Sequence, residues 1–464
     1  DTQLNALDEY LVASVSSSSS AAASASPSVS RSTDTDNALI VNAILSILRT
    51  LQWKQVEFRQ SFLIDFDSCL AAANGWARMS DQADELLTDL SRVRYSHLGW
   101  DAGETKERLT EWDISISLVD TEARKLIDMY SQDSVRAAQH AAIYIMTTIQ
   151  QSDIPRLLFS IEWEDELVQN EVAKRIVSTF DDYLMDTKQC LETSYLFDKV
   201  VAALVRSTVC FYVQCLVIKA DRARRRRYRR GGGSPMKKKK TKKNKKKKNG
   251  DNGRPFESPN RAVTRMKYDI EVFHDYFMDI TGNNNGMKRL VTNELSVLTL
   301  LLEFMSYAAG GRGSGTDSLE EFVVVVHKRT GADGTTTGNF LSDIYVLMDQ
   351  DGSKHEVVKK TIQNMQNDLD LVTERVNDKR EAFGSYRFDG CQTVCSSNQE
   401  ASDADTASEE TASFRLDVML KALYDERKVQ KDSRICGTLV DDVKSRAGDV
   451  QQRFDQLRLM FGIA

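Results

Sequence analysis

Residues 358–376 read VKKTIQNMQNDLDLVTERV, and the spacing of their apolar side chains decides the fold class. The apolar positions follow one another at alternating intervals of four and three: Val358, Ile362, Met365, Leu369, Val372 and Val376. This spacing places all of them on one face of an α-helix, as in a helix that packs lengthwise against another. The stretch therefore predicts a long amphipathic helix whose core side includes Leu369.

The same period recurs in other parts of the chain. It appears at 39–70, at 167–184 and again at 439–461. Alternating strand-like patterns are nearly absent, and only the short apolar run from Phe322 to Val326 fits a strand as well as a helix. No proline follows Pro259, so nothing there must interrupt a helix. We predict an all-α fold, an elongated rod of consecutive helical bundles with roughly ten to thirteen helices.

Three low-complexity segments divide the chain. Residues 1–36 combine the end of a helix with a Ser/Ala-rich segment, residues 221–260 hold a basic run, and residues 389–413 are acidic and Ser-rich. Such compositions bury too little apolar surface to fold on their own, so we expect disordered insertions there. The remaining chain predicts helical bundles at 37–220 and 261–464. Within the first bundle, Pro155 follows Ser152 and Asp153 as a residue in the first turn of a helix would.

One segment is apolar enough to be mistaken for a membrane span. It lies between Lys199 and Lys219 and is followed directly by basic residues. Arg206 stands near its middle, where a charge costs about 2.5 to 3.5 kcal/mol in a bilayer, and Gln214 adds a polar group. A helix buried in a protein bundle is the better interpretation.

The residues that usually carry catalysis or metal binding are scattered. The five histidines are His97, His140, His274, His327 and His355. None is spaced as a metal ligand with another His or with a Cys. We therefore predict no catalytic, cofactor-binding or metal site, and a scaffold rather than an enzyme. The rival class, an enzyme, would require the fold to gather these groups in one pocket.

Cysteine usage indicates the compartment. The chain has seven Cys, an odd number at irregular spacing, which suits reduced thiols in a cytosolic protein better than a disulfide framework. The first residue is Asp1, with no leader pattern after it, which indicates a fragment.

The most unusual feature is a dense basic run at residues 222–248, RARRRRYRRGGGSPMKKKKTKKNKKKK. It holds 17 basic residues and no acidic one, whereas the whole chain has a formal net charge of -6. The remaining 437 residues therefore carry a charge of -23, which argues against a specific nucleic-acid binder. Tyr228 is its one aromatic residue, so stacking platforms for bases are lacking.

Four interpretations of the basic run stay open: a solvated insertion, a contact with anionic lipids, a nuclear-import signal, or incidental affinity for RNA. The candidate lipid-contact residues are Arg224, Arg225, Arg226, Arg227, Arg229, Arg230, Lys237, Lys238, Lys239, Lys240, Lys242, Lys243, Lys245, Lys246, Lys247 and Lys248.

Four stretches, in order, carry a resemblance to a known family. They are STFDDYLMDTKQCLETSYLFDKVVAALVRSTVCFYVQCLV at 178–217, RMKYDIEVFHDYFMDI at 265–280, NELSVLTLLLEFM at 293–305 and FLSDIYVLMDQDGSKHEVVKKTIQ at 340–363. Together they resemble the C-terminal half of the exocyst subunit of the Sec-six type. The stretches are packing motifs, and the basic run and the acidic Ser-rich segment are longer than the insertions expected for this family.

The resemblance implies a subunit of the exocyst, the octameric peripheral complex that tethers secretory vesicles to the plasma membrane before SNARE-driven fusion. It implies helical bundles stacked into a rod, no enzymatic activity and no cofactor. The implied partners are other exocyst subunits and SNARE proteins or their regulators, at a cytoplasmic location on the plasma membrane and secretory vesicles. Two alternatives remain: a scaffold of another tethering complex, or a nuclear or RNA-associated helical protein that uses the basic run.

Overall fold

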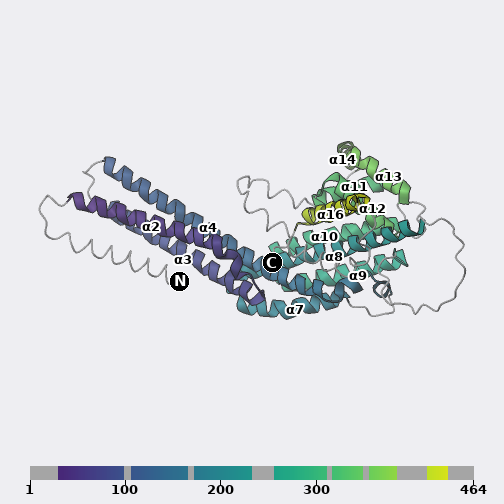
Figure 1. Cartoon of the computed structure of the whole chain (residues 1–464), viewed down its shortest axis with the longest axis horizontal. Coiled ribbons are helices and arrows are strands. Elements are labelled where there is room, and N and C mark those ends of the chain that lie inside the picture. The colour runs from purple at the N-terminus through teal and green to yellow at the C-terminus, as the bar shows by residue number, and fades with distance from the viewer. Residues whose placement is uncertain are drawn as a thin grey trace. The chain divides into compact units, whose positions relative to one another are not determined.

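The computed structural model of the chain describes residues 30–98, 106–165, 172–231, 255–310, 316–348, 355–383 and 415–436 (Figure 1). Within these ranges the regular structure is entirely helical, with fourteen α-helices, one 3-10 helix and no strand. The prediction of an all-α protein is confirmed. The expected acidic loop at 389–413 and the periodic stretch at 439–461 lie outside the described residues.

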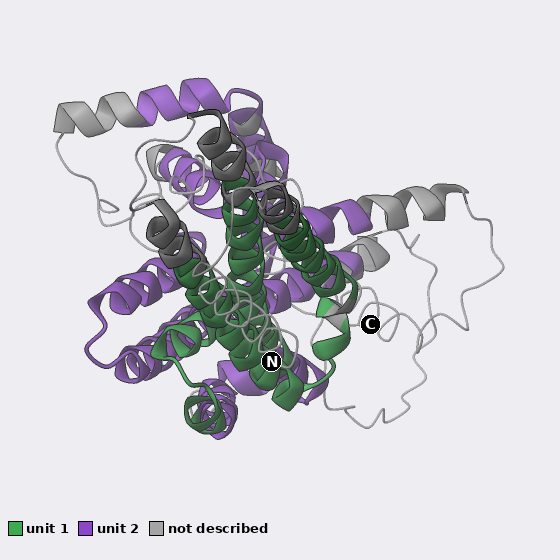
Figure 2. Cartoon of the chain, turned by 90° about the vertical axis from the view of Figure 1, so that its left-hand side faces the viewer, with its two compact units in different colours: residues 1–144, 185–200 green, residues 145–184, 201–464 purple. Residues whose placement is uncertain are grey.

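The chain forms two compact units (Figure 2). Unit 1 comprises Asp1–Tyr144 and Met185–Val200, and unit 2 comprises Ile145–Leu184 and Val201–Ala464. This division differs from the two bundles expected on either side of 221–260. It differs because the boundaries between the units fall after residues 144, 184 and 200, inside continuous helices, and not at the basic run.

Unit 1 is built on α2 (Ser30–Phe58), the 3-10 helix η2 (Arg59–Phe62), α3 (Phe66–Leu98) and the first part of α4 (Lys106–Gln151). The start of α2 corrects one expectation: residues 30–36, predicted to be disordered, are helical, because neither Pro nor Gly follows Pro27 in that stretch.

The core of unit 1 combines large and small apolar side chains from α2, α3 and α4. Fully buried members include Leu48, Ala73, Leu126, Ala138 and Ala141. Polar bonds join α2 to α4, since Gln55 Nε2 donates to Asp133 Oδ2 at 2.6 Å and Gln52 Nε2 donates to the carbonyl of Glu122 at 2.9 Å. The core and these bonds fix which face of α2 is turned inward.

Unit 2 holds the remaining helices. They are α5 (Ile154–Leu157), α6 (Ile161–Glu164), most of α7 (Val172–Cys190) and of α8 (Ser194–Gly231), α9 (Pro259–Ile280), α10 (Asn285–Ala308), α11 (Thr316–Thr330), α12 (Gly334–Met348), α13 (His355–Asn367), α14 (Leu369–Phe383) and α16 (Leu416–Cys436). Pro155 lies in the first turn of α5, as predicted. The ambiguous run Phe322–Val326 is helical and lies within α11.

The stretch that decided the fold class forms two helices instead of one. α13 ends at Asn367 and α14 begins at Leu369, with a turn at Asp368. α13 packs mainly against α12, whereas α14 packs mainly against α11, so the apolar seam is divided between two partners. Ile362 and Val372 are fully buried. Leu369 lies at the break and is only half-buried, so its expected place in the core is wrong.

The apolar helix α8 is the one described helix that is long and apolar enough to span a membrane by length and composition. However, 83% of its apolar window is buried inside the protein. Arg206, near its middle, forms an ion pair of 2.8 Å with Glu294 of α10. These contacts support the interpretation as a core helix of a bundle.

Candidate protein-interaction site

A buried carboxylate, Asp269 of α9, connects three helices of unit 2. Trp163 Nε1 of α6 donates to Asp269 Oδ2 at 2.8 Å, and the Tyr212 hydroxyl of α8 donates to the same oxygen at 3.0 Å. The guanidinium of Arg265, one turn earlier on α9, lies 3.7 Å from Oδ1. Burial raises the pKa of Asp269 to about 6, although these three partners act in the opposite direction. The Asp269 cluster therefore stabilises the arrangement of helices.

A second buried pair lies close to this cluster. Glu164 accepts hydrogen bonds from the backbone nitrogens of Glu257 at 2.7 Å and Ser258 at 3.1 Å, just before α9 begins. A carboxylate at this position offsets the unpaired N–H groups of a helix start. Lys219 of α8 lies 3.5 Å from Glu164 and also donates to the carbonyl of Phe159, a residue with a positive φ of 61°. Burial lowers the pKa of Lys219 to about 8.

A third buried carboxylate, Asp343 of α12, receives donors from two other helices. Arg224 of α8 and Arg427 of α16 both form ion pairs with Asp343, and the Tyr424 hydroxyl of α16 donates to it at 3.0 Å. Arg427 also donates to the carbonyl of Val217 at 2.7 Å. This Asp343 cluster attaches α16 to the C-terminal part of α8.

The cluster changes the interpretation of the basic run. Arg224, a predicted lipid-contact residue, instead pairs with buried Asp343, and Arg225 pairs with Asp221 one turn earlier at 2.8 Å. Four further candidates, Arg226, Arg227, Arg229 and Arg230, lie on the last turns of α8, where the structure describes only the backbone. The ten lysine candidates, from Lys237 to Lys248, lie outside the described residues.

The predicted disordered insertion at 221–260 is therefore wrong at both ends. Residues 221–231 continue α8, and in this part Arg224 and Arg225 pair with acids of unit 2. On the other side, Phe256 is buried and its backbone nitrogen donates to the carbonyl of Leu347 at 3.0 Å. Residues 232–254 of the predicted insertion lie outside the described residues.

Several large apolar side chains on and just after α2 in unit 1 are exposed. We call the exposed pair Leu39 and Trp53, on the side of α2 opposite its buried residues, the α2 outer face; Ile47, Val56, Phe62 and Ile64 are also exposed. Trp53 is 59% exposed and Leu39 is 67% exposed. Large exposed apolar patches on a protein often mark sites where other molecules bind.

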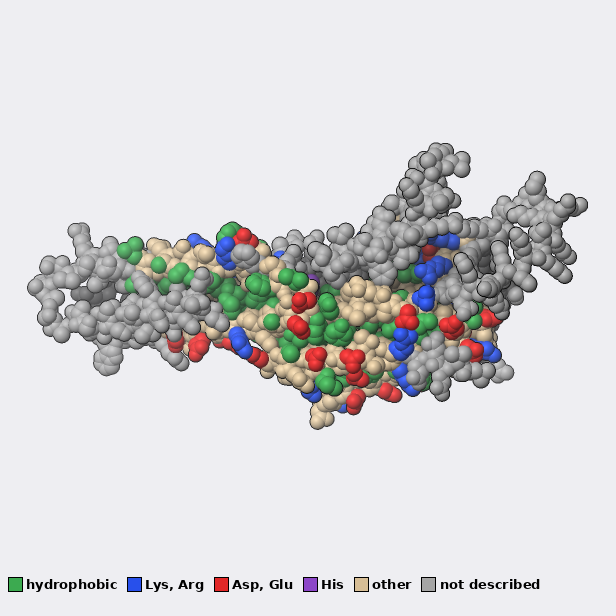
Figure 3. All heavy atoms as spheres, turned by 60° about the horizontal axis from the view of Figure 1, so that its bottom comes forward, with side chains coloured by type: hydrophobic (Ala, Val, Ile, Leu, Met, Phe, Trp, Pro, Cys, Tyr) green, Lys and Arg blue, Asp and Glu red, His purple; other side chains and the backbone are tan. Residues whose placement is uncertain are grey.

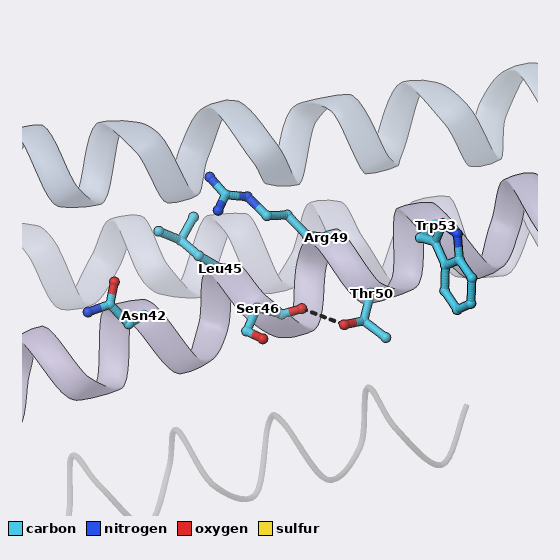
Figure 4. A pocket seen from close by; sticks show the side chains of 6 residues that line it. All are labelled: Asn42, Leu45, Ser46, Arg49, Thr50 and Trp53. Carbon is cyan, nitrogen blue, oxygen red and sulfur yellow. Dashed lines mark hydrogen bonds between the residues drawn. The ribbon is translucent and has the colours of Figure 1, made fainter.

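A shallow hollow of about 360 Å³ lies on this face of α2. Among the described residues it is lined by Asn42, Leu45, Ser46, Arg49, Thr50 and Trp53 (Figure 4). Thr50 Oγ1 donates to the carbonyl of Ser46 at 2.7 Å, which satisfies that hydroxyl within the helix. The hollow is floored by small and polar groups, with the Trp53 indole at one end.

Neither a cluster of charged side chains nor a metal-binding group provides a second candidate binding site in the described parts of the chain. Asp and Glu side chains are spread over the described surface on the face that Figure 3 shows, without a deep cleft between them. Within the described ranges no group of three His, Cys, Asp or Glu residues is placed to hold a metal ion. The α2 outer face is therefore the surface that offers most for binding.

Sequence reasoning missed both the α2 outer face and the Asp343 cluster. The signal for the cluster was a single acid inside the apolar run FLSDIYVLM, at 340–348, because a charge there must find a buried partner. The identity of that partner was not available, since Arg427 is far away in sequence. The signal for the outer face was Trp53 on the polar side of α2.

Comparison with known proteins shows a likeness of fold to a solved structure. No family model matches the chain, and no curated protein matches its sequence. The chain is similar to a solved structure, the crystal structure of the C-terminal domain of the exocyst subunit Sec6p, with a TM-score of 0.50 and 14% sequence identity. The match covers 77% of this chain and 78% of that chain. The resemblance seen in the four sequence stretches is thus confirmed as a likeness of fold: this chain shares the all-helical fold of an exocyst subunit's C-terminal domain.

Proposed function

We propose that the protein is a non-enzymatic subunit of an exocyst-type tethering complex and that it acts by binding other subunits. The observation that carries this proposal is the likeness of fold to the exocyst domain over 77% of the chain. In this role it holds secretory vesicles at the plasma membrane before SNARE-mediated fusion. Its partners are other exocyst subunits and SNARE proteins or their regulators, and its location is cytoplasmic and peripheral to both membranes.

The chemistry of the buried titratable groups supports a scaffold. Asp269, Glu164 and Asp343 are each fixed by donors from neighbouring elements, and none of them lines the hollow on α2. Groups held in this way stabilise helix packing, whereas a general acid or base must reach a substrate. The shallow hollow also differs from the enclosed pocket that usually surrounds a small substrate.

The basic run adds a membrane contact to the proposal. Lysines 237–248 lie outside the described residues, between the end of α8 at Gly231 and buried Phe256, and give this part of the chain a high positive charge. Each basic residue near an anionic leaflet contributes about 1 kcal/mol at low salt. Because such a segment loses conformational entropy when it docks, we expect weak binding that counts as one contact among many.

Affinity purification of the tagged full chain from native cells tests the function. We expect exocyst subunits to co-purify, both with the natural chain and with a variant in which Lys237–Lys248 are replaced by Ser and Gly. Recovery of ribonucleoproteins that is lost in the variant and after nuclease treatment, without any exocyst subunit, would favour the RNA-associated alternative. Recovery of another set of tethering subunits would assign the chain to a different complex.

A further inference from the structure

The helix α16 rests on unit 2 with few buried apolar side chains. It packs against α12 (Figure 1), and among its described side chains, at 416–427, the buried apolar ones are Met419 and Leu420. A helix of the unit's core buries many more, and Leu298, Leu301 and Phe304 are three of those in α10. Since the free energy of packing grows with the apolar area that is buried, α16 depends strongly on its polar contacts.

Those polar contacts converge on one carboxylate, Asp343 of α12. The Tyr424 hydroxyl donates to Asp343 at 3.0 Å, and Arg427 forms an ion pair with it. Tyr424 and Arg427 are three residues apart, so they lie on the same side of α16. Arg427 also donates to the carbonyl of Val217 in α8 at 2.7 Å. Asp343 is therefore the main point at which α16 is held.

Release of α16 leaves the polar groups that it contacts on the other helices with partners of their own. Asp343 keeps its ion pair with Arg224 of α8. Asp221, which lies 3.8 Å from the guanidinium of α16, keeps its ion pair with Arg225 at 2.8 Å. The carbonyl of Val217 lies inside α8, where it accepts the backbone N–H four residues later. Breaking a buried ion pair is most costly when one charge is left without a partner, and that does not occur here.

The Asp269 cluster does not allow such a release. Its donors Trp163 and Tyr212 are themselves fully buried, so α6, α8 and α9 can separate only by exposing both aromatic side chains. In the Asp343 cluster, by contrast, 18% of the Arg427 side chain is already exposed. Elements that open separately from the rest of a protein have few buried apolar contacts. α16 meets this description, whereas α9 does not.

We propose that α16 is a releasable cover, a helix that opens from unit 2 while helices α8 to α12 stay folded. Asp343 is its latch, because both donors of α16 meet there. Opening uncovers the side of α12 that carries Asp343. The inference does not depend on the proposed function.

Hydrogen exchange of the full chain, read peptide by peptide with mass spectrometry, tests the opening. We expect the amides of 420–427 to be protected at least about tenfold less than those of 297–305 in α10, because they exchange through local opening. Low concentrations of urea should hardly change the exchange of 420–427, since local opening exposes little surface. The exchange of 297–305 should rise steeply with urea, because it requires unfolding of the unit.

Matched substitutions in α16 test the latch. Arg427→Met removes the ionic donor to Asp343, and we expect the protection of 420–427 to fall about tenfold or more while that of 297–305 stays the same. Tyr424→Phe removes only a hydroxyl and should cause a smaller fall. Lys421→Met is the control, because Lys421 is an exposed basic residue of the same helix, and it should leave the protection of 420–427 unchanged.

Three results would overturn the proposal. Equal protection of 420–427 and 297–305, with the same dependence on urea, means that α16 opens only when unit 2 unfolds. Exchange of 420–427 at the rate of an unfolded peptide means that α16 is not docked. An equal effect of Arg427→Met and Lys421→Met means that Asp343 is not the latch.

Discussion

Replacing Asp343 with Leu is expected to destabilise unit 2 by about 3 kcal/mol, at the lower end of the cost of breaking a buried ion pair. Asp343 is fully buried, and its loss leaves the Arg224 and Arg427 guanidiniums and the Tyr424 hydroxyl without this acceptor. The lower end applies because both arginine side chains keep some contact with water, at 30% exposed for Arg224 and 18% for Arg427. They therefore recover part of their solvation.

The fluorescence of Trp163 isolates this effect. Trp163 is the one tryptophan of unit 2, so replacing the other four with Phe leaves a reporter of that unit alone. With a urea dependence of about 2 to 3 kcal/mol per molar, the loss should lower the unfolding midpoint by about 1 to 1.5 M. The matched control is Asp275→Leu, because Asp275 is a largely exposed acid on α9.

A double substitution distinguishes an unpaired charge from poor packing. Adding Arg427→Met to Asp343→Leu removes one of the stranded charges, so we expect the pair to be more stable than the sum of the single effects predicts. If Asp343→Leu shifted the midpoint no more than Asp275→Leu does, the Asp343 cluster would not stabilise unit 2, and its role in attaching α16 would be refuted.

Three further predictions concern Asp269, helix α14 and the lysines of the basic run. Burial raises the pKa of Asp269 to about 6 from 3.8, so protonated Asp269 stabilises unit 2 fully below pH 4, and this stabilisation is lost as pH rises through 6. Asp269→Asn should flatten this part of the dependence of unfolding free energy on pH, measured by Trp163 fluorescence. An unchanged dependence on pH would contradict the prediction. Val372→Asp should cost about 3 kcal/mol or more, while the adjacent Leu371→Asp, at an exposed position, should cost little; equal melting temperatures of the two would contradict the packing of α14. Replacing Lys237–Lys248 with Ser and Gly should reduce co-sedimentation with acidic liposomes at low salt and make no difference at high salt; equal binding at low salt would assign any membrane contact to the folded units.

The fold class was predictable because helical periodicity is a local property. The four-and-three spacing at 358–376 required only that apolar groups share a face, and the structure places Ile362 and Val372 in the core as that spacing indicates. The break at Asp368 was not predictable from spacing, since the same seam serves one long helix or two short ones. Which of these forms depends on the separate partners of the two helices, since α13 packs mainly on α12 and α14 mainly on α11.

The interaction site was harder to predict for a different reason. An amphipathic pattern identifies the strongest apolar stripe of a helix, and for α2 that stripe is the buried one. Trp53 and Leu39 looked like isolated apolar residues on a polar side, which occur on most protein surfaces. Their position opposite the core becomes clear only when the buried side of α2 is known.

The sequence analysis treated all basic residues of 222–248 as one run, but the structure distinguishes two groups among them. Arg224 and Arg225 belong to α8 and pair with acids of unit 2, whereas Lys237–Lys248 follow after the helix has ended. Deleting the whole run, 222–248, would therefore remove a partner of Asp343 together with any lipid contact, and thermal stability would fall for a reason unrelated to membranes. A loss of binding would then have two explanations. Substitution confined to Lys237–Lys248 leaves the Asp343 cluster intact, so a change in binding measures the charge of these lysines alone.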